Sequence, residues 1–232
     1  MNIKECIILA GGLGTRLRSA VPDLPKCMAP VAGKPFLSYV IDHLQAQGLE
    51  RFIFSLGYKH EVIEAYLDHA YAALQKEYVV ENEPLGTGGA IQLAVKQATE
   101  KNVLVLNGDT LFKIQVQPLA DFHQQHAACC TLALKPLQHF DRYGVVELQE
   151  NGAVKSFREK QFYQSGCING GIYALQTDAF LQEGLPEKFS FEKDYLEKLY
   201  TTRPMFGMVQ DAYFIDIGIP EDYEKANADL AC

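Results

Sequence analysis

The sequence lacks the long apolar segments that membrane insertion requires. A transmembrane helix needs ~20 consecutive apolar residues, and no run in the 232 residues approaches that length. Residues 1–5 place an acidic residue before a short β-like run, whereas a signal peptide has a longer apolar stretch and a small-residue cleavage site. We therefore expect a cytoplasmic protein with no membrane partner.

Positive charge is also scarce. The chain has 21 Lys and Arg against 29 Asp and Glu, a net charge of −8, and no stripe of basic residues. Nucleic-acid-binding domains usually carry a basic footprint, so we expect no nucleic-acid partner. A few well-placed cations can still bind a phosphorylated small molecule. The sequence leaves open whether the chain forms a homo-oligomer.

The cysteines form no C-x-x-C pair. The six occur at Cys6, Cys27, Cys129, Cys130, Cys167 and Cys232. Their spacing fits neither a zinc site nor a disulfide framework. We expect reduced, mostly buried thiols, in agreement with a cytoplasmic location.

Internal repeats, low-complexity segments and linker-like stretches are absent as well. In the first half, apolar runs predict strands at residues 3–9, 51–56, 78–80 and 103–106. Between them, helical spacing predicts helices from Pro35 to Gly48, over 59–74 and over 87–98. This alternation is typical of right-handed βαβ crossovers and a largely parallel sheet.

The second half has a different pattern. Its β-like runs lie at residues 131–134, 145–148 and 171–175, and its helical patterns only at 192–200 and 221–230. This favours antiparallel additions to the sheet. We predict one α/β domain over 1–232, with a Rossmann-like fold and a mixed, mostly parallel central sheet with helices on both faces. Residues 1–115 are predicted to bind a nucleotide and residues 116–232 another ligand.

A glycine-rich loop, G-G-L-G-T-R, directly follows the first predicted strand. Its glycines, which allow positive φ angles and a close approach of backbone N–H groups to a phosphate, are Gly11, Gly12 and Gly14. Loops at the carboxyl ends of strands are where open α/β sheets bind ligands. Arg16, Arg18 and, ten residues after Arg16, Lys26 follow the loop. Cations in this place suit a triphosphate.

Two familiar phosphate-binding patterns do not fit this loop. The dinucleotide fingerprint G-x-G-x-x-G requires a glycine at the position of Leu17. A Walker A loop requires G-x-x-x-x-G-K, but Met28 stands where the first glycine before Gly33-Lys34 should be. The loop therefore indicates another class of nucleotide-binding protein.

Residues 9–16, together with Pro25-Lys26, resemble the signature of the sugar-1-phosphate nucleotidyltransferase family, G-G-x-G-T-R followed by P-K. In that family the loop wraps the nucleotide phosphates, and the matching arginine and lysine hold the triphosphate. The resemblance implies nucleotide-binding roles for Leu9, Gly11, Gly12, Gly14, Thr15, Arg16 and Lys26.

Later segments continue the resemblance. Residues 84–90, P-L-G-T-G-G-A, resemble the segment beside the nucleotide base, which implies roles for Gly86 and Thr87. Asp109 resembles the family's magnesium ligand and nucleotide-site aspartate, and Asp216, in a late D-x-G motif, resembles the second metal carboxylate. Because Mg²⁺ commonly takes one or two carboxylates plus substrate phosphates, it is the expected cofactor.

The second half matches the family's sugar-phosphate site. Lys160 is expected to contact the phosphate of the sugar and Glu159 its hydroxyls, since both match an E-K pair. Gly144 and Asn169 lie in segments that resemble other parts of the sugar-phosphate site. The chain departs from many relatives at Cys27, where they carry proline, and at Ile219, where they carry threonine. Neither change removes a charge.

The implied reaction is in-line attack of the sugar phosphate on the α-phosphorus of a nucleoside triphosphate, with loss of pyrophosphate. Two anions must approach each other, so positioning and charge neutralisation carry most of the catalysis. The attacking phosphate is already ionised at neutral pH, so no general base is needed. The resemblance implies catalytic roles for Arg16, Lys26, Asp109, Lys160 and Asp216.

Several segments resemble one subgroup of the family, the D-glycero-D-manno-heptose 1-phosphate guanylyltransferases. These segments are residues 24–30, 140–144, 168–173, 188–192 and 213–218. The implied substrates are GTP and a heptose 1-phosphate, and the implied product is GDP-heptose for bacterial surface glycans. Because Cys232 follows soon after the late aspartate motif, we expect a single-activity enzyme without the β-helical extension of acetyltransferase-fused relatives. Mannose 1-phosphate or another hexose phosphate remains an alternative substrate, and a non-catalytic sugar-nucleotide sensor an alternative function.

Glu81 bears on the choice of base. It closes the third predicted strand, where uridylyl- and thymidylyltransferase relatives commonly carry glutamine. A carboxylate can accept hydrogen bonds from both guanine N1–H and the 2-amino group, but it repels a uracil carbonyl. We therefore predict a nucleotide-binding role for Glu81 and a preference for GTP. The alternative is that Glu81 points to solvent from the strand end.

Overall fold

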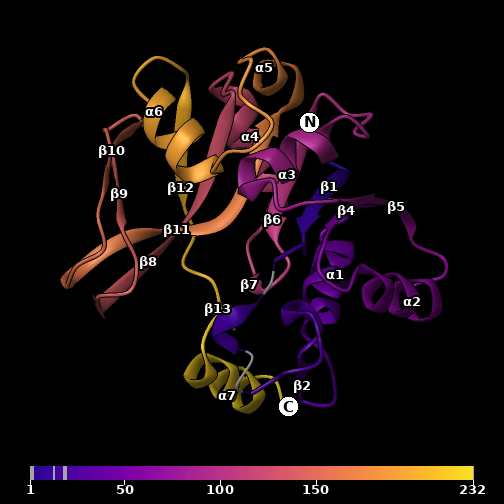
Figure 1. Ribbon diagram of the computed structural model, residues 1–232. Coiled ribbons are helices and arrows are strands. Elements are labelled where there is room, and N and C mark those ends of the chain that lie inside the picture. The colour runs from indigo at the N-terminus through magenta and orange to yellow at the C-terminus, as the bar shows by residue number, and fades with distance from the viewer. Residues whose placement is uncertain (1–2, 13, 18–19, 232) are drawn as a thin grey trace.

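The computed structural model describes residues 3–12, 14–17 and 20–231. A central sheet runs through the molecule (Figure 1). Its first-half strands are all parallel, in the order β6-β1-β4-β5. They are β1 (Glu5–Leu9), β4 (Arg51–Leu56), β5 (Gln75–Val80) and β6 (Asn102–Asn107).

The second half extends this sheet with antiparallel strands. β11 pairs antiparallel with β6, β8 and β9, and β9 pairs antiparallel with β10. β12 pairs parallel with β8. Their bounds are β8 (Cys130–Phe140), β9 (Val145–Leu148), β10 (Val154–Arg158), β11 (Tyr163–Gln176) and β12 (Met205–Val209). The predicted mixed sheet with antiparallel additions is confirmed.

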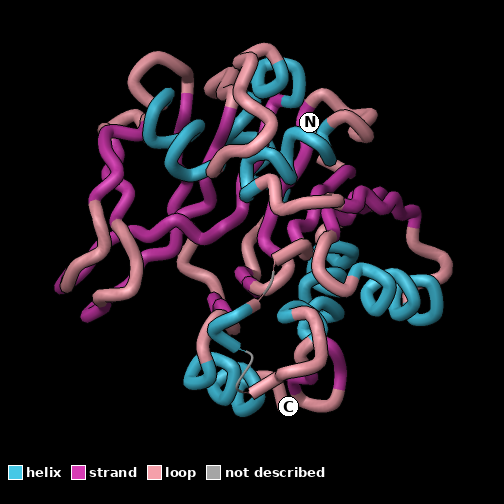
Figure 2. Tube along the Cα trace, viewed as in Figure 1, coloured by secondary structure: helices cyan, strands magenta, loops and turns pink. Residues whose placement is uncertain are grey.

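Helices cover both faces of the sheet, as predicted (Figure 2). Side chains alternate along β1, so that Ile8 packs into one core cluster and Ile7 into the other. The first cluster includes residues of α1 (Phe36–Ala46), α2 (His60–Ala70), α4 (Val116–Gln125) and α7 (Pro220–Asp229). The second includes α3 (Gly86–Val95), α5 (Thr177–Leu181) and a π-helical turn (Phe191–Leu196) that continues into α6 (Glu197–Leu199).

Two short sheets lie outside the main one. β7 (Thr110–Phe112) pairs antiparallel with β13 (Phe214–Asp216), and β2 (Pro30–Val31) with β3 (Lys34–Pro35). Single 3₁₀ turns occupy Thr15–Leu17 and Lys26–Met28. The β7–β13 pair matters most for function, because it returns the late part of the chain to the turn that follows β6.

Neighbouring boundaries in the first half need correction. The helix predicted over residues 59–74 ends at Ala70, and the Tyr71 carbonyl accepts a 3.2 Å hydrogen bond from Lys76 Nζ. The strand predicted over 78–80 already begins at Gln75. Its first residues are exposed or half-buried at the edge of the sheet, so no apolar run reveals them.

No helix within the described ranges is both long and apolar enough to cross a bilayer. Cys6, Cys27, Cys129 and Cys130 are free and buried, and Cys167 is free and half-buried. The expectation of mostly buried thiols is confirmed for these five, while Cys232 lies outside the described residues.

Candidate active site

The glycine loop after β1 is shaped by close contacts. Gly14 has a φ of +57°, and its carbonyl accepts a 3.0 Å bond from Leu17 N that begins the 3₁₀ turn. A Cβ on Gly11 would lie 2.8 Å from Glu81 Oε1, and one on Gly14 would lie 3.0 Å from Lys26 Cβ. The positive φ and the close contact require glycine at position 14, whereas a side chain at position 11 would displace the Glu81 carboxylate. A Cβ on Gly12 would meet no atom within 4 Å, so this glycine faces open space.

This loop forms one wall of a cavity of about 190 Å³. The cavity is lined by Leu9, Ala10, Gly12, Gly14, Thr15, Arg16, Lys26, Cys27, Asp109 and Gly218. Most of the predicted phosphate-site residues thus meet in one place. Leu13 and Arg18, which also belong to the predicted segment, lie outside the described residues.

Lys26 links the two predicted metal carboxylates. Its Nζ lies 2.6 Å from Asp109 Oδ2 and 3.2 Å from Asp216 Oδ1. The three side chains are largely shielded, with exposed fractions of 12%, 32% and 27% respectively. Residues far apart in the sequence therefore form one charged cluster at the cavity.

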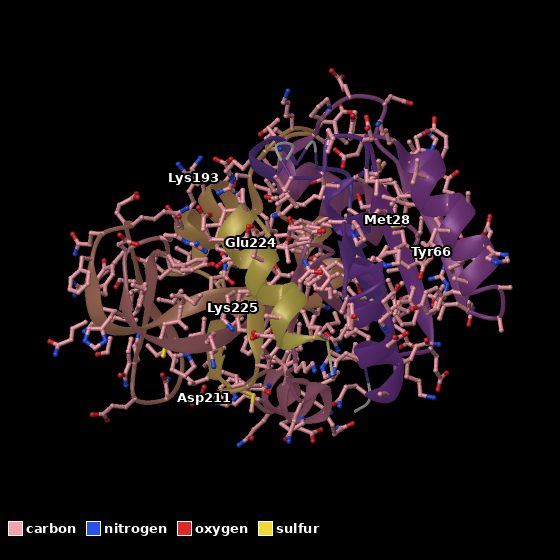
Figure 3. The ribbon with its side chains drawn as sticks, turned by 90° about the horizontal axis from the view of Figure 1, so that it is seen from below. Met28, Tyr66, Lys193, Asp211, Glu224 and Lys225 are labelled. Carbon is pink, nitrogen blue, oxygen red and sulfur yellow. The ribbon has the colours of Figure 1, made fainter. Side chains whose placement is uncertain are left out.

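The strand pairing explains why these residues meet. Asp109 follows β6 in the turn that leads into β7, and the β7–β13 register places Asp216 opposite Thr110. Ile217 N donates to the Asp109 carbonyl (3.1 Å) and holds the two turns together. α7 follows directly, and Figure 3 shows its Glu224 and Lys225 between the first half, marked by Met28 and Tyr66, and the second-half strands.

Gly218 is a site residue that sequence analysis missed. A Cβ there would lie 2.9 Å from Asp216 Oδ1 and 3.2 Å from Lys26 Nζ, so a side chain would crowd the ion cluster. The D-x-G pattern was the available signal, but it was used only for its aspartate. Cys27 also lines the cavity, although no site role was predicted for it.

Burial and mutual charge shift the pKa values of side chains in and beside this charged cluster. Burial raises the pKa of Asp216, and the charge of Asp109 raises it further, while Lys26 opposes the change. Burial alone would lower the pKa of Lys26, but the two carboxylates outweigh it and raise that pKa. Burial, with the charge of Asp109, raises the pKa of Cys27 to about 12. Cys27 therefore stays a protonated thiol at neutral pH and is a neutral part of the wall.

The donor set suits a hard divalent cation. The described residues contain no group of three or more His, Cys, Asp or Glu that could hold a metal by itself. Mg²⁺ does not need one, because it commonly keeps water and phosphate ligands beside one or two carboxylates. The Lys26 ammonium bonds both Asp109 and Asp216, which shows that the two carboxylates can share one cation. These residues thus fit Mg²⁺ completed by substrate phosphates.

Glu81 turns inward between two loops. Its Oε2 accepts a 2.9 Å hydrogen bond from Leu85 N, and its Oε1 lies against Gly11. Burial raises its pKa, and the bond from Leu85 opposes that increase. The carboxylate therefore lies beside both glycine loops, and the solvent-facing alternative does not describe its position.

The Gly86 loop packs against another part of the protein. Gly86 has a φ of +75°, and a Cβ there would lie 2.5 Å from the Phe189 carbonyl. A Cβ on Gly88 would lie 2.1 Å from the Phe189 ring. Thr87 Oγ1 donates to Glu192 Oε2 (2.7 Å). The protein itself thus accounts for these glycines, and base binding by Gly86 and Thr87 stays a prediction.

The predicted sugar-site residues do not line the cavity. A Cβ on Gly144 would lie 2.4 Å from the Arg158 carbonyl. The Asn169 side chain donates to Tyr173 OH (2.8 Å) and accepts from Gly171 N (3.0 Å). Glu159 and Lys160 are exposed on the connection between β10 and β11. The pairings of Val145 with Arg158 and with Ile168 nevertheless place Gly144 between Glu159 and Asn169, and Lys160 follows Glu159 directly.

Sequence analysis also missed an ion pair that joins the segment before β9 to α7, near Asp216. Arg142 forms an ion pair with Asp222, in the first turn of α7, and donates to Tyr143 OH (3.1 Å). The Tyr143 ring packs on Phe214 of β13, with 6.2 Å between centroids. Within segment 141–144 only Gly144 was predicted to be a site residue, and no local pattern pairs Arg142 with a helix 80 residues later.

The parallel strands, the glycine loop at their carboxyl edge and the paired carboxylates are the arrangement expected of a nucleotide-binding transferase. The chain matches the family model described as "Nucleotidyl transferase" over residues 5–232, and it belongs to this family. The family expected from the motifs is confirmed.

The chain is similar to individual members of this family to different degrees. D-glycero-alpha-D-manno-heptose 1-phosphate guanylyltransferase of Aneurinibacillus thermoaerophilus is 50% identical over 97% of this chain and 98% of its own. Mannose-1-phosphate guanylyltransferase of Mycobacterium tuberculosis is 34% identical over 97% of this chain but only 64% of its own. The crystal structure of HddC from Yersinia pseudotuberculosis complexed with GMP-PN is 38% identical, with a TM-score of 0.87 over 98% of this chain and 99% of that one.

Proposed function

We propose that this protein transfers GMP from GTP to D-glycero-α-D-manno-heptose 1-phosphate, giving GDP-heptose and pyrophosphate. The observation that carries the proposal is the 50% identity, over nearly the full length of both chains, to an enzyme named for this heptose phosphate. The relative named for mannose 1-phosphate is less similar and much longer than this chain. Both names include guanylyl transfer, which agrees with the prediction from Glu81.

The site accounts for the chemistry in the following way. A phosphate oxygen of the heptose substrate attacks the α-phosphorus, and the bond from that phosphorus to the leaving pyrophosphate breaks. Backbone N–H groups of the loop that contains Gly11, Gly12 and Gly14 bind the triphosphate. Arg16 is exposed at the mouth of the same cavity as Lys26, and the two cations neutralise charge on the departing pyrophosphate.

Asp109 and Asp216 are the residues that would hold Mg²⁺, as their shared contact with Lys26 supports. When bound, Mg²⁺ supplies positive charge that offsets the repulsion between the two phosphates. The nucleophile is ionised already, so neither the neutral thiol of Cys27 nor any histidine is needed as a base.

Base selection is assigned to the two loops that flank Glu81. One oxygen of its carboxylate holds Leu85 N, and carboxylate oxygens have further lone pairs for the N1–H and 2-amino groups of guanine. Gly86 and Thr87 follow immediately in the chain. In Glu81→Gln we expect the preference for GTP over UTP to weaken, because an amide offers uracil a donor. An unchanged preference would remove Glu81 from base selection.

The heptose phosphate is assigned to the second half, residues 116–232. Lys160 is proposed to bind the phosphate and Glu159 the sugar hydroxyls, which their exposure leaves accessible. Gly144 and Asn169 shape the backbone of neighbouring strands. The division is not strict, since Gly218 of the second half lines the cavity and Asp216 contacts Lys26 of the first half. The free thiols agree with a cytoplasmic setting.

Pyrophosphate release by the whole chain tests the proposal. The assay crosses GTP, ATP, UTP and dTTP with the 1-phosphates of the heptose, mannose and glucose, in Mg²⁺. We expect the largest kcat/KM with GTP and the heptose phosphate. Faster turnover of mannose 1-phosphate would replace the heptose, and nucleotide-sugar binding without any pyrophosphate release would make the protein a sensor.

A further inference from the structure

Lys26 occupies a position that two ligands would compete for. Its ammonium group contacts Asp109 and Asp216 at 2.6 and 3.2 Å, and its side chain is only 12% exposed. Neither carboxylate has another ion pair within the described ranges. In this arrangement the lysine is the cation that offsets two neighbouring negative charges.

The same lysine also borders the phosphate cavity. A Cβ on Gly14 would lie 3.0 Å from Lys26 Cβ, so the start of the lysine side chain is held against the glycine loop. Lys26 lines the cavity together with Gly12, Thr15 and Arg16. Its flexible methylene chain lets the ammonium turn from the carboxylates toward a phosphate while its Cβ stays in place.

Lys26 and a divalent cation cannot both bind the carboxylates of Asp109 and Asp216 fully. While Nζ lies 2.6 Å from Asp109 Oδ2, a divalent cation cannot use the same oxygen without bringing two positive charges together. A Cβ on Gly218 would lie 3.2 Å from Nζ, so the absence of a side chain there leaves room for the ammonium.

We propose that Lys26 serves as a stand-in cation for the carboxylate pair, and that the nucleotide and the divalent cation replace it together. The triphosphate draws the ammonium toward the glycine loop, and the vacated carboxylates take the metal. The divalent cation then binds weakly in the absence of nucleotide. The divalent cation and the nucleotide each strengthen the binding of the other. The nucleotide part of this exchange rests on the proposed function, whereas the blocking of the metal site by Lys26 does not.

The test measures Mn²⁺ binding to the full chain in the absence of nucleotide, by electron paramagnetic resonance of free Mn²⁺. We expect Lys26→Met to bind Mn²⁺ at least about 10-fold more tightly than the wild type, because coupling of this kind typically spans about 5- to 150-fold. Asp216→Asn added to Lys26→Met should abolish the gain. The wild type itself should bind Mn²⁺ only weakly.

Lys135→Met is the matched control. Lys135 Nζ lies 2.6 Å from Asp211 Oδ1, and its side chain is 14% exposed, so its setting resembles that of Lys26 without a second carboxylate. Its loss should leave Mn²⁺ affinity unchanged. Equal Mn²⁺ affinity in wild type and folded Lys26→Met would overturn the proposal.

A wild-type measurement keeps the proposal testable should Lys26→Met fail to fold. Tight nucleotide-free Mn²⁺ binding to the wild type, lost in Asp109→Asn, would show that Lys26 does not obstruct the carboxylates. None of these readings uses turnover or a sugar phosphate, so failure of the proposed reaction would leave them unaffected.

Discussion

The candidate residues of the first half are brought together by loops, whereas those of the second half are brought together by strand register. Lys26 and Asp109 lie in turns that line one cavity beside a parallel sheet. The pairings of Val145 with Arg158 and with Ile168 place Gly144 between Glu159 and Asn169. Parallel strands bring their carboxyl ends, and the loops that follow, to one place. The phosphate site is therefore formed by loops at one edge of the sheet, while the predicted sugar site lies across neighbouring antiparallel strands.

The largest loss of activity should come from changes to the two carboxylates beside the phosphate cavity. Asp109→Asn or Asp216→Asn should lower kcat about 10³-fold, comparable to the loss of a strong electrostatic contact to the transition state. The volume of the side chain is kept, so the fold should survive, as circular dichroism can check. Asp211→Asn, which changes an exposed carboxylate that pairs with Lys135, is the control. Near-normal Mg²⁺-dependent activity in either site variant would rule out the metal assignment.

A buried polar group of the second half should instead affect stability. His123 bonds Thr131 Oγ1 (2.9 Å) and Asn102 Oδ1 (3.2 Å), and burial lowers its pKa from 6.5 to about 4. Between these values the unfolded chain binds more protons than the folded one. The free energy of unfolding should therefore fall by about 3 kcal/mol as pH drops through this window.

Urea unfolding from pH 7 to pH 4 checks this second prediction. In His123→Gln the acid-induced loss should shrink, while in His69→Gln, at an exposed position on α2, it should match the wild type. An identical pH dependence in His123→Gln would show that other groups cause the loss. Turnover at pH 7.5 by the folded variant should stay close to normal, in contrast to the aspartate variants.

Lys160 tests whether the predicted sugar-site residues of the second half take part in the reaction. Lys160→Ala should lose about 2 kcal/mol of binding to the sugar phosphate, roughly a 30-fold rise in its KM, with nucleotide affinity kept. Lys155→Ala changes another exposed lysine on β10 and should have little effect. Weakened GTP binding with an unaltered sugar-phosphate KM would assign Lys160 to the other substrate.

Substitutions in the two glycine loops should have the smallest effects, one on GTP affinity and the other on stability. Gly12→Ala meets no atom within 4 Å, so stability should hold while GTP affinity falls about 10-fold, because the methyl group enters the phosphate cavity. Gly88→Ala would strike the Phe189 ring at 2.1 Å and should lower the free energy of unfolding by about 1–3 kcal/mol. Thermal melts and GTP titrations distinguish the two. Reversed results would exchange the roles assigned to the two loops.

The sequence predicted the first-half architecture well because its signals are local. Buried parallel strands are short apolar runs, and β4 begins and ends where such a run predicts. β11 was recognised only at residues 171–175, although it starts at Tyr163. Its earlier residues include Gly166, Asn169 and Gly170, which interrupt any apolar run. The alternation that reveals half-buried strands is obscured there.

Site contacts between distant segments could not be predicted in the same way. The motifs indicated that Asp109 and Asp216 act together, but the ion pair of both with Lys26 depends on the β7–β13 register. The packing of Gly88 under Phe189 joins residues about a hundred positions apart. Only the three-dimensional pairing of elements determines such contacts, so composition and spacing carry no signal for them.

The β7–β13 pair also sets how long the assembled site persists. It consists of three residue pairs, supported by an edge-to-face contact of Phe112 and Phe214 at 5.6 Å. Leu111, Phe112 and Ile215 of this pair are at most 4% exposed and belong to the first core cluster, so the pair cannot open without exposing core side chains, and its amides should exchange slowly. Asp216 is thereby held beside Asp109 for as long as this part of the core stays packed. On warming, the enzyme should therefore keep its active centre until the core itself unfolds.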